Sequence, residues 1–134
     1  MELNKFIRDV AGLSCVQRFS QTKMASPENV LEHSGFTVIV CLFIGETINL
    51  AGGDVDIGTL LSKAALHDFD EVITGDIAMP VKYHTPEIRA LLSKMECENM
   101  KIMSSKYSIS ELLYSTWRDS KNGLEGKIVS LADN

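Results

Sequence analysis

The segment of residues 29–50 constrains the fold of this chain more than any other feature. Wound into a helix, it is apolar nearly all round and lacks the polar face of a surface helix. Such a helix is typical of a protein interior, so we expect a central buried helix here. The longest apolar run, 36–44, is far shorter than the ~20 residues that a membrane-spanning helix needs, and we expect no membrane association.

The rest of the chain is also predicted to be helical. Apolar residues recur at helical spacing from Leu3 to Val10, Gly12 offers a stop, and Asp56 can cap a later helix. Pro80 disfavours helix just before it, which predicts a loop at 79–83. The expected helices cover residues 3–12, 29–50, 57–73, 86–103, 110–117 and 126–134. This pattern predicts an all-α fold of about five to six helices in one domain, residues 1–134, whose last helix is truncated.

Composition excludes several classes of protein. The 134 residues are 45% hydrophobic, enough for one domain with its own core. A net charge of −5 argues against a protein that coats nucleic acid, which would carry a basic face. Cys15, Cys41 and Cys97 are odd in number and widely separated, which excludes a thiolate zinc site and fits a reducing compartment. The N-terminus lacks the features of a signal peptide, so we expect a cytoplasmic protein.

His67 and Asp68 are adjacent polar residues inside an otherwise apolar stretch. Burying an imidazole and a carboxylate is costly unless a positive group binds them, and a divalent metal would do so. Glu71 would share their stripe if the helix continued through it. His33 begins another helical run, and Asp133 follows an apolar turn near the end of the sequence. Two His and two Asp residues make a plausible set of nitrogen and oxygen ligands for a divalent ion.

The order and spacing of four segments resemble the HD-domain phosphohydrolases, in particular the YfbR-type 5′-deoxynucleotidases. The segments are Arg18-Phe19, 28–34, 67–76 and 80–83, within a resemblance that extends from residue 18 to residue 133. The resemblance implies an HD-domain helical bundle that hydrolyses the 5′-phosphate of deoxynucleoside monophosphates, commonly as a homodimer. It also implies that His33, His67, Asp68 and Asp133 hold a divalent cation, for which Mn²⁺, Fe²⁺, Co²⁺, Ni²⁺, Zn²⁺ and Mg²⁺ are the candidates.

Phosphate ester hydrolysis requires positive charge and an activated water, and a metal provides both. We expect Glu71 to orient the attacking water and to move a proton. Arg18 can bind the phosphate with two donors of its guanidinium group, and Lys82 could add a second cation. Ion pairing of Arg18 with Glu28 or Glu32 is the competing interpretation.

The segment after the expected metal-binding helix corresponds to the part of the resembling family that contacts the nucleotide. Asp76 is expected to accept from the sugar hydroxyl, and Ile77, Ala78 and Met79 are expected to contact sugar and base. Phe19 completes the expected substrate site, but it stands where the family has Trp, and Ala78-Met79 replace a Pro-Thr pair. Loss of the indole removes a donor and stacking area, which affects substrate range more than reaction class.

Three functions remain open on sequence alone. The first is the metal-dependent 5′-deoxynucleotidase, and the second is a triphosphohydrolase of the same fold acting on dNTPs such as dATP. The third is a catalytically silent HD-type protein that binds nucleotides or partners. For the enzyme we expect a small-molecule deoxynucleotide as the substrate and no nucleic acid polymer as a partner.

Overall fold

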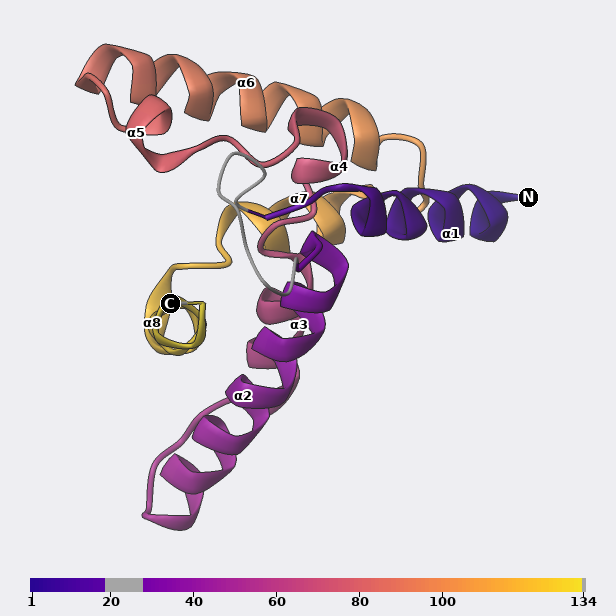
Figure 1. Ribbon diagram of the computed structural model, residues 1–134. Helices are drawn as coiled ribbons and strands as arrows, with labels where there is room; N and C mark the ends of the chain where they lie inside the picture. The colour runs from indigo at the N-terminus through magenta and orange to yellow at the C-terminus, as the bar shows by residue number, and fades with distance from the viewer. Residues whose placement is uncertain (19–27, 134) are drawn as a thin grey trace.

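The structure is a computed structural model that describes residues 1–18 and 28–133, and this part of the chain is helical throughout its regular elements (Figure 1). Its long helices are α1 (Glu2–Gly12), α2 (Val30–Leu50), α3 (Ile57–Leu66), α6 (Pro86–Ser104), α7 (Ser110–Arg118) and α8 (Gly123–Ala132). Three shorter elements are η1 (Leu13–Cys15), α4 (Glu71–Thr74) and α5 (Met79–Lys82). The all-α prediction is confirmed.

Side-chain caps start three of the long helices where the sequence predicts a start. The Asn29 side chain accepts from the Glu32 amide at 2.8 Å, and Asp56 accepts from the Thr59 amide at 3.1 Å. Thr85 does the same for α6, with Pro86 in the first turn, where a missing amide proton costs nothing. Local chemistry therefore fixes where these helices begin.

Helices α2, α3 and α8 pack together around one apolar cluster (Figure 1). Leu60, Cys41 and Val129 are fully buried at its centre. A Cβ atom added to Gly45 would lie 2.6 Å from a Leu60 methyl group, so the absent side chain lets α3 approach α2 closely. This packing fixes the three helices whose ends carry the candidate metal ligands.

A second apolar cluster joins α1, α6 and α7 to the turn after α3. Phe69, Met100 and Trp117 are buried in it, together with Leu13 and Val30. The Phe69 ring stacks on Phe6 of α1 at 5.8 Å between centroids. The turn that follows α3 is thus anchored in this second core.

The prediction that α2 is buried all round is wrong for the described residues. Its inner face packs on α3 and α8, but Phe36, Ile39 and Phe43 on the other side are 57%, 70% and 72% exposed. Periodicity could not indicate which apolar face would remain uncovered. By length and hydropathy alone α2 could cross a bilayer, and one of its faces packs on α3 and α8.

Three predicted boundaries differ from the structure. The expected helix 57–73 ends at Leu66, and residues 67–70 form a turn before the short α4. The expected loop at 79–83 contains the helical turn α5, because Pro80 lies in its first turn and needs no amide partner there. The last helix begins at Gly123, whose φ of 72° favours glycine, three residues before the predicted start.

Candidate metal centre

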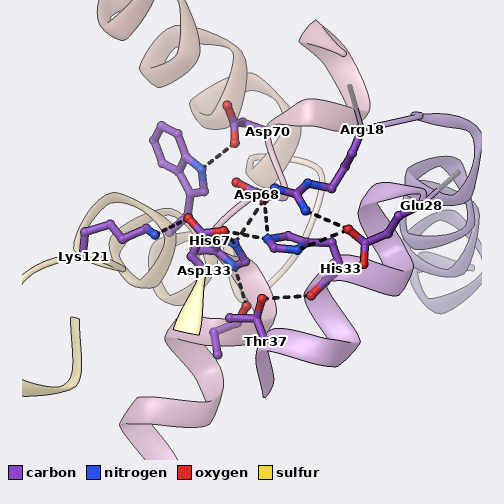
Figure 2. A network of polar contacts seen from close by, with 11 residues as sticks. Arg18, Glu28, His33, Thr37, His67, Asp68, Asp70, Lys121 and Asp133 are labelled. Atoms are coloured by element: carbon purple, nitrogen blue, oxygen red, sulfur yellow. Dashed lines mark hydrogen bonds and ion pairs between the residues drawn. The ribbon is translucent and has the colours of Figure 1, made fainter. Parts of the chain in front are cut away.

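Four side chains predicted as metal ligands converge on one point (Figure 2). Nε2 of His33 lies 2.6 Å from Oδ1 of Asp133, and Nε2 of His67 lies 3.2 Å from the same oxygen. Oδ2 of Asp68 lies 3.1 Å from Nε2 of His67 and 3.8 Å from Nε2 of His33. We call these four residues the metal group.

The spacing within the metal group suits a single divalent ion. Ligand atoms about 2.0–2.2 Å from one ion lie roughly 3.0–3.5 Å from each other. The four ligand atoms lie within 4.8 Å of one another, with contacts of 2.6 to 3.8 Å among them. Two imidazole nitrogens and two carboxylate oxygens are also a donor set that borderline divalent metals accept. The residues present therefore fit such an ion.

The metal group forms where three helix ends meet. His33 lies in the first turn of α2, His67 directly follows α3, and Asp133 directly follows α8. The C-terminal ends of α3 and α8 carry partial negative charge, which favours a cation. The Nδ1 atom of His67 donates to the Ala64 carbonyl at 2.7 Å in the tautomer that leaves Nε2 free as a ligand.

The charges of the metal group are strongly coupled. Burial alone would lower the pKa of His67, but hydrogen bonds with Asp133 and Asp68 outweigh it and raise this pKa to about 10. Burial would raise the pKa of Asp133, yet hydrogen bonds from His33, His67 and Lys121 hold it far below its usual range. Burial would also raise the pKa of Asp68, but the hydrogen bond with His67 and the charges of His67 and His33 together lower it. Asp68 and Asp133 are therefore held as carboxylates, and the positive charges of protonated His67 and of Lys121 balance them.

Glu71, the predicted general base, begins α4 beside the metal group. Burial and then the charges of Asp68, Asp70 and Asp76 raise the pKa of Glu71 to about 9, while Lys82 opposes the shift. These effects place Glu71 in the same electrostatic environment as Asp68. The predicted stripe on one continuous helix is wrong, since a turn separates α3 from α4, but Glu71 still lies next to the group.

Arg18, the predicted phosphate ligand, is linked to the metal group through Glu28. Its Nη1 donates to Oε2 of Glu28 at 2.7 Å, and the same oxygen lies 3.7 Å from Nδ1 of His33 (Figure 2). The ion pair with Glu28, named as the competing interpretation, is therefore present. It also holds Arg18 at the edge of the group, so the two interpretations are compatible.

The remaining predicted substrate residues follow α4. Gly75, with φ of 70°, ends α4, and Asp76, Ile77 and Ala78 are half-buried in the segment that leads to α5. In α5 itself, Met79 is exposed, and Lys82 Nζ lies 3.6 Å from Oε1 of the buried Glu96. Phe19 lies outside the described residues.

Three features near the metal group were missed by the sequence analysis. Lys121 donates to Oδ2 of Asp133 at 2.6 Å, a contact that no local sequence motif indicates. Glu28 contacts His33, a role that its place in the motif 28–34 could have suggested. Asp70 is only 8% exposed and accepts from Nε1 of Trp117 at 3.0 Å, a contact that no local pattern indicates.

Comparison with known proteins agrees with this geometry. The family model described as 5′-deoxynucleotidase YfbR-like matches residues 5–134. The chain belongs to this family. A 5′-deoxynucleotidase of Vibrio parahaemolyticus is 34% identical over 101 residues, which cover 72% of this chain and 50% of that protein. A 5′-deoxynucleotidase of Photorhabdus laumondii is 34% identical over 95 residues, covering 70% of this chain and 48% of that one.

The fold comparison points to the same superfamily. An HD-domain phosphohydrolase of Listeria innocua matches with a TM-score of 0.88 and 29% identity, over 98% of this chain and 64% of that one. A Pyrococcus furiosus protein with 21% identity and a TM-score of 0.78 shares the fold. This YfbR-like chain thus has the HD-domain fold and spans about half the length of the curated relatives it matches.

Proposed function

We propose that this protein hydrolyses the 5′-phosphate of deoxynucleoside monophosphates, with a divalent cation held by His33, His67, Asp68 and Asp133. The observation that carries the proposal is the convergence of their four ligand atoms within 4.8 Å. Membership of the YfbR-like family supports the substrate class. Mn²⁺, Fe²⁺, Co²⁺, Ni²⁺, Zn²⁺ and Mg²⁺ are the candidate ions, and the mixed nitrogen and oxygen donors favour the borderline metals among them.

A cation in this position supplies a water of lowered pKa and neutralises phosphate charge. Within the chain, Glu71 orients the attacking water and accepts its proton. Burial, followed by the charges of Asp68, Asp70 and Asp76, raises the pKa of Glu71 to about 9, so this group holds its proton at neutral pH in the metal-free chain. A cation on Asp68 would offset one of the charges behind this shift, which favours the ionised form that a general base requires.

The other predicted residues would bind and orient the nucleotide. Arg18, whose Nη1 lies 2.7 Å from Oε2 of Glu28, would bind the phosphate at the edge of the metal group. Lys82, held 3.6 Å from Glu96, contributes a second cation. Asp76 accepts from the sugar hydroxyl. The sugar and base contact four apolar residues, which are Phe19, Ile77, Ala78 and Met79.

A product screen tests this function. The purified protein is incubated with dNMPs and dNTPs in Mn²⁺ or Co²⁺, and again after treatment with a chelator. Free phosphate from dNMPs, abolished by chelator and restored by metal, is the expected result. Release of triphosphate from dNTPs would assign the triphosphohydrolase activity instead, and no product from either substrate would leave a silent nucleotide-binding protein.

We also propose that the protein forms a homodimer through the outer face of α2. The apolar side chains of Phe36, Ile39 and Phe43 share this face and are exposed in the single chain. Exposed apolar patches of this kind mark association surfaces. An Ile39→Asp variant should be monomeric by light scattering, whereas Leu91→Asp on α6, a position 68% exposed, should retain the dimer. A monomeric wild-type protein would contradict the proposal.

We place the protein in the cytoplasm, where its proposed substrates occur. Its three cysteines, Cys15, Cys41 and Cys97, form no disulfide with one another, as is usual for a reducing compartment. Cell fractionation with antibody detection would test this location, and recovery in a membrane or secreted fraction would contradict it.

A further inference from the structure

The turn that carries two members of the metal group is not part of a regular helix. α3 ends at Leu66, and the Phe69 amide donates to the Leu66 carbonyl at 3.1 Å. The Glu71 amide donates to the Asp68 carbonyl at 3.0 Å, so residues 67–70 are held by tight local turns. Such a segment depends on tertiary contacts to fix the direction of its side chains. The contacts of Phe69 and Asp70 therefore affect His67 and Asp68.

The four residues of this turn face two environments. His67 and Asp68 point into the metal group, whereas Phe69 is buried in the second apolar cluster. Asp70 is 8% exposed and accepts a hydrogen bond at 3.0 Å from the indole of Trp117, 47 residues later (Figure 2). A buried carboxylate needs such a donor. The bond joins the turn directly to α7.

We infer that Trp117 is a positioning residue for the metal group, acting through its hydrogen bond to Asp70. Trp117 itself lies on α7 and is packed in the second apolar cluster. Its partner Asp70 lies two residues after the ligand Asp68 in the chain. By holding Asp70, the indole keeps His67 and Asp68 aimed at His33 and Asp133. The inference rests on the proposed metal site and adds α7 to the elements that build it.

Residues of the turn that are not ligands also affect cation affinity, because they determine how the side chains of His67 and Asp68 are oriented toward the ion. Loss of a residue that orients a metal ligand typically weakens binding by roughly 10–100-fold. In Trp117→Phe the ring is retained in the core but the donor is lost, which leaves the Asp70 carboxylate buried without its indole partner. Asp70→Ala removes the acceptor, and Asp70→Asn keeps an oxygen that accepts from the indole while removing the charge.

A matched control comes from another aromatic residue in the same region. Tyr107 is also buried, and its hydroxyl donates to the carboxylate of Asp9. Tyr107→Phe therefore removes one aromatic-to-carboxylate hydrogen bond, just as Trp117→Phe does, but the carboxylate is that of Asp9 on α1 and not that of Asp70. A general loss of core stability would affect both variants, whereas a positioning role would affect only the first.

The experiment measures Mn²⁺ affinity by equilibrium dialysis for the wild-type protein and each variant, with thermal unfolding to verify folding. We expect binding at least roughly 10-fold weaker in Trp117→Phe and Asp70→Ala, with most of the affinity kept in Asp70→Asn and Tyr107→Phe. Trp117 is the single tryptophan, so its emission should change in Asp70→Ala and remain close to wild type in Asp70→Asn. The double variant Trp117→Phe/Asp70→Ala should bind no more weakly than either single one.

Three results would overturn the inference. Wild-type affinity in both Trp117→Phe and Asp70→Ala would remove any positioning role. Equal weakening in Asp70→Asn and Asp70→Ala would assign the effect to charge, and equal weakening in Tyr107→Phe would assign it to core stability. Should Trp117→Phe fail to fold, the two Asp70 variants decide the question. Absence of Mn²⁺ binding by the wild-type protein would instead overturn the metal site itself.

Discussion

Asp133 and His33, separated by 100 positions in the chain, bring Oδ1 and Nε2 within 2.6 Å of each other. The same Asp133 oxygen lies 3.2 Å from Nε2 of His67, so one carboxylate atom faces both imidazoles. Without a cation, protonated histidine supplies the charge that this carboxylate requires. A metal ion would compete with that proton for the same atoms, and much of the expected behaviour of the protein follows from this competition.

Metal affinity is expected to rise with pH because of His67. Its pKa is raised to about 10 by Asp133 and Asp68 against the effect of burial, and only the neutral imidazole binds a cation. Between pH 7 and 9 the apparent affinity for Mn²⁺ should increase by on the order of tenfold per pH unit for one displaced proton. Calorimetric titration across this range measures it, and a pH-independent affinity would contradict the assignment of His67.

Stability of the metal-free protein should change in the opposite direction. Because the pKa of His67 rises from 6.5 unfolded to about 10 folded, the folded state binds the proton more tightly. This stabilisation is fully present below pH 6.5 and is lost as the pH rises through 10. Urea unfolding of the metal-free protein should show a free energy of unfolding that falls over that pH range. A constant value would contradict the raised pKa of His67 in the folded state.

Replacement of Glu71 by Gln should abolish turnover without loss of metal. Gln cannot accept the proton of the attacking water, and loss of general base catalysis typically costs about 10²–10⁴-fold in kcat. The control is Glu111→Gln, the same change at an exposed position of α7. Metal content is measured by elemental analysis beside the rate of phosphate release. A Glu71→Gln enzyme with unchanged kcat would exclude the general base role.

Arg18→Ala should weaken phosphate binding more than it affects metal content. Arg18 lies at the edge of the metal group through Glu28, and a guanidinium bound to phosphate contributes mostly to substrate affinity. We expect KM for a dNMP to rise by on the order of tenfold. Arg118→Ala provides the matched control, since Arg118 is exposed and paired with Asp119 at 3.0 Å. Equal KM values for Arg18→Ala and Arg118→Ala would exclude phosphate binding by Arg18 and leave it only the ion pair with Glu28.

Leu60→Ala should destabilise the packing that fixes the three helix ends. Leu60 is fully buried between α2 and α8, and such a truncation typically costs about 2–5 kcal/mol. Leu91→Ala, on an exposed part of α6, should change the free energy of unfolding by less than about 0.5 kcal/mol. Urea denaturation compares them, and similar values would contradict the assignment of this cluster as the core.

Sequence alone predicted most of the helices because local signals mark their ends. Asn29, Asp56 and Thr85-Pro86 have capping chemistry that acts within one turn. The turn at residues 67–70 was not predictable in this way, since Phe69 and Asp70 are held by α1 and α7, far away in the chain. An all-round apolar pattern likewise predicts a helix at 29–50 but cannot say which face remains exposed.

In the candidate site, the metal ligands could be predicted from the sequence, but the residues that orient them could not. His33, His67, Asp68 and Asp133 were named from residue type, spacing and family resemblance, and the structure brings all four together. Residues that orient them were missed, because the contacts of Lys121 with Asp133 and of Trp117 with Asp70 leave no pattern in the chain. Support from neighbouring helices becomes visible only in three dimensions.

The most direct measurement is anomalous X-ray diffraction from crystals of the protein grown with Mn²⁺ or Co²⁺. One anomalous peak is expected per chain, within bonding distance of Nε2 of His33 and His67 and of a carboxylate oxygen of Asp68 and Asp133. Soaking in chelator should remove it. A cation bound elsewhere, or no peak between these four side chains at saturating metal, would contradict the metal centre and the hydrolytic function built on it.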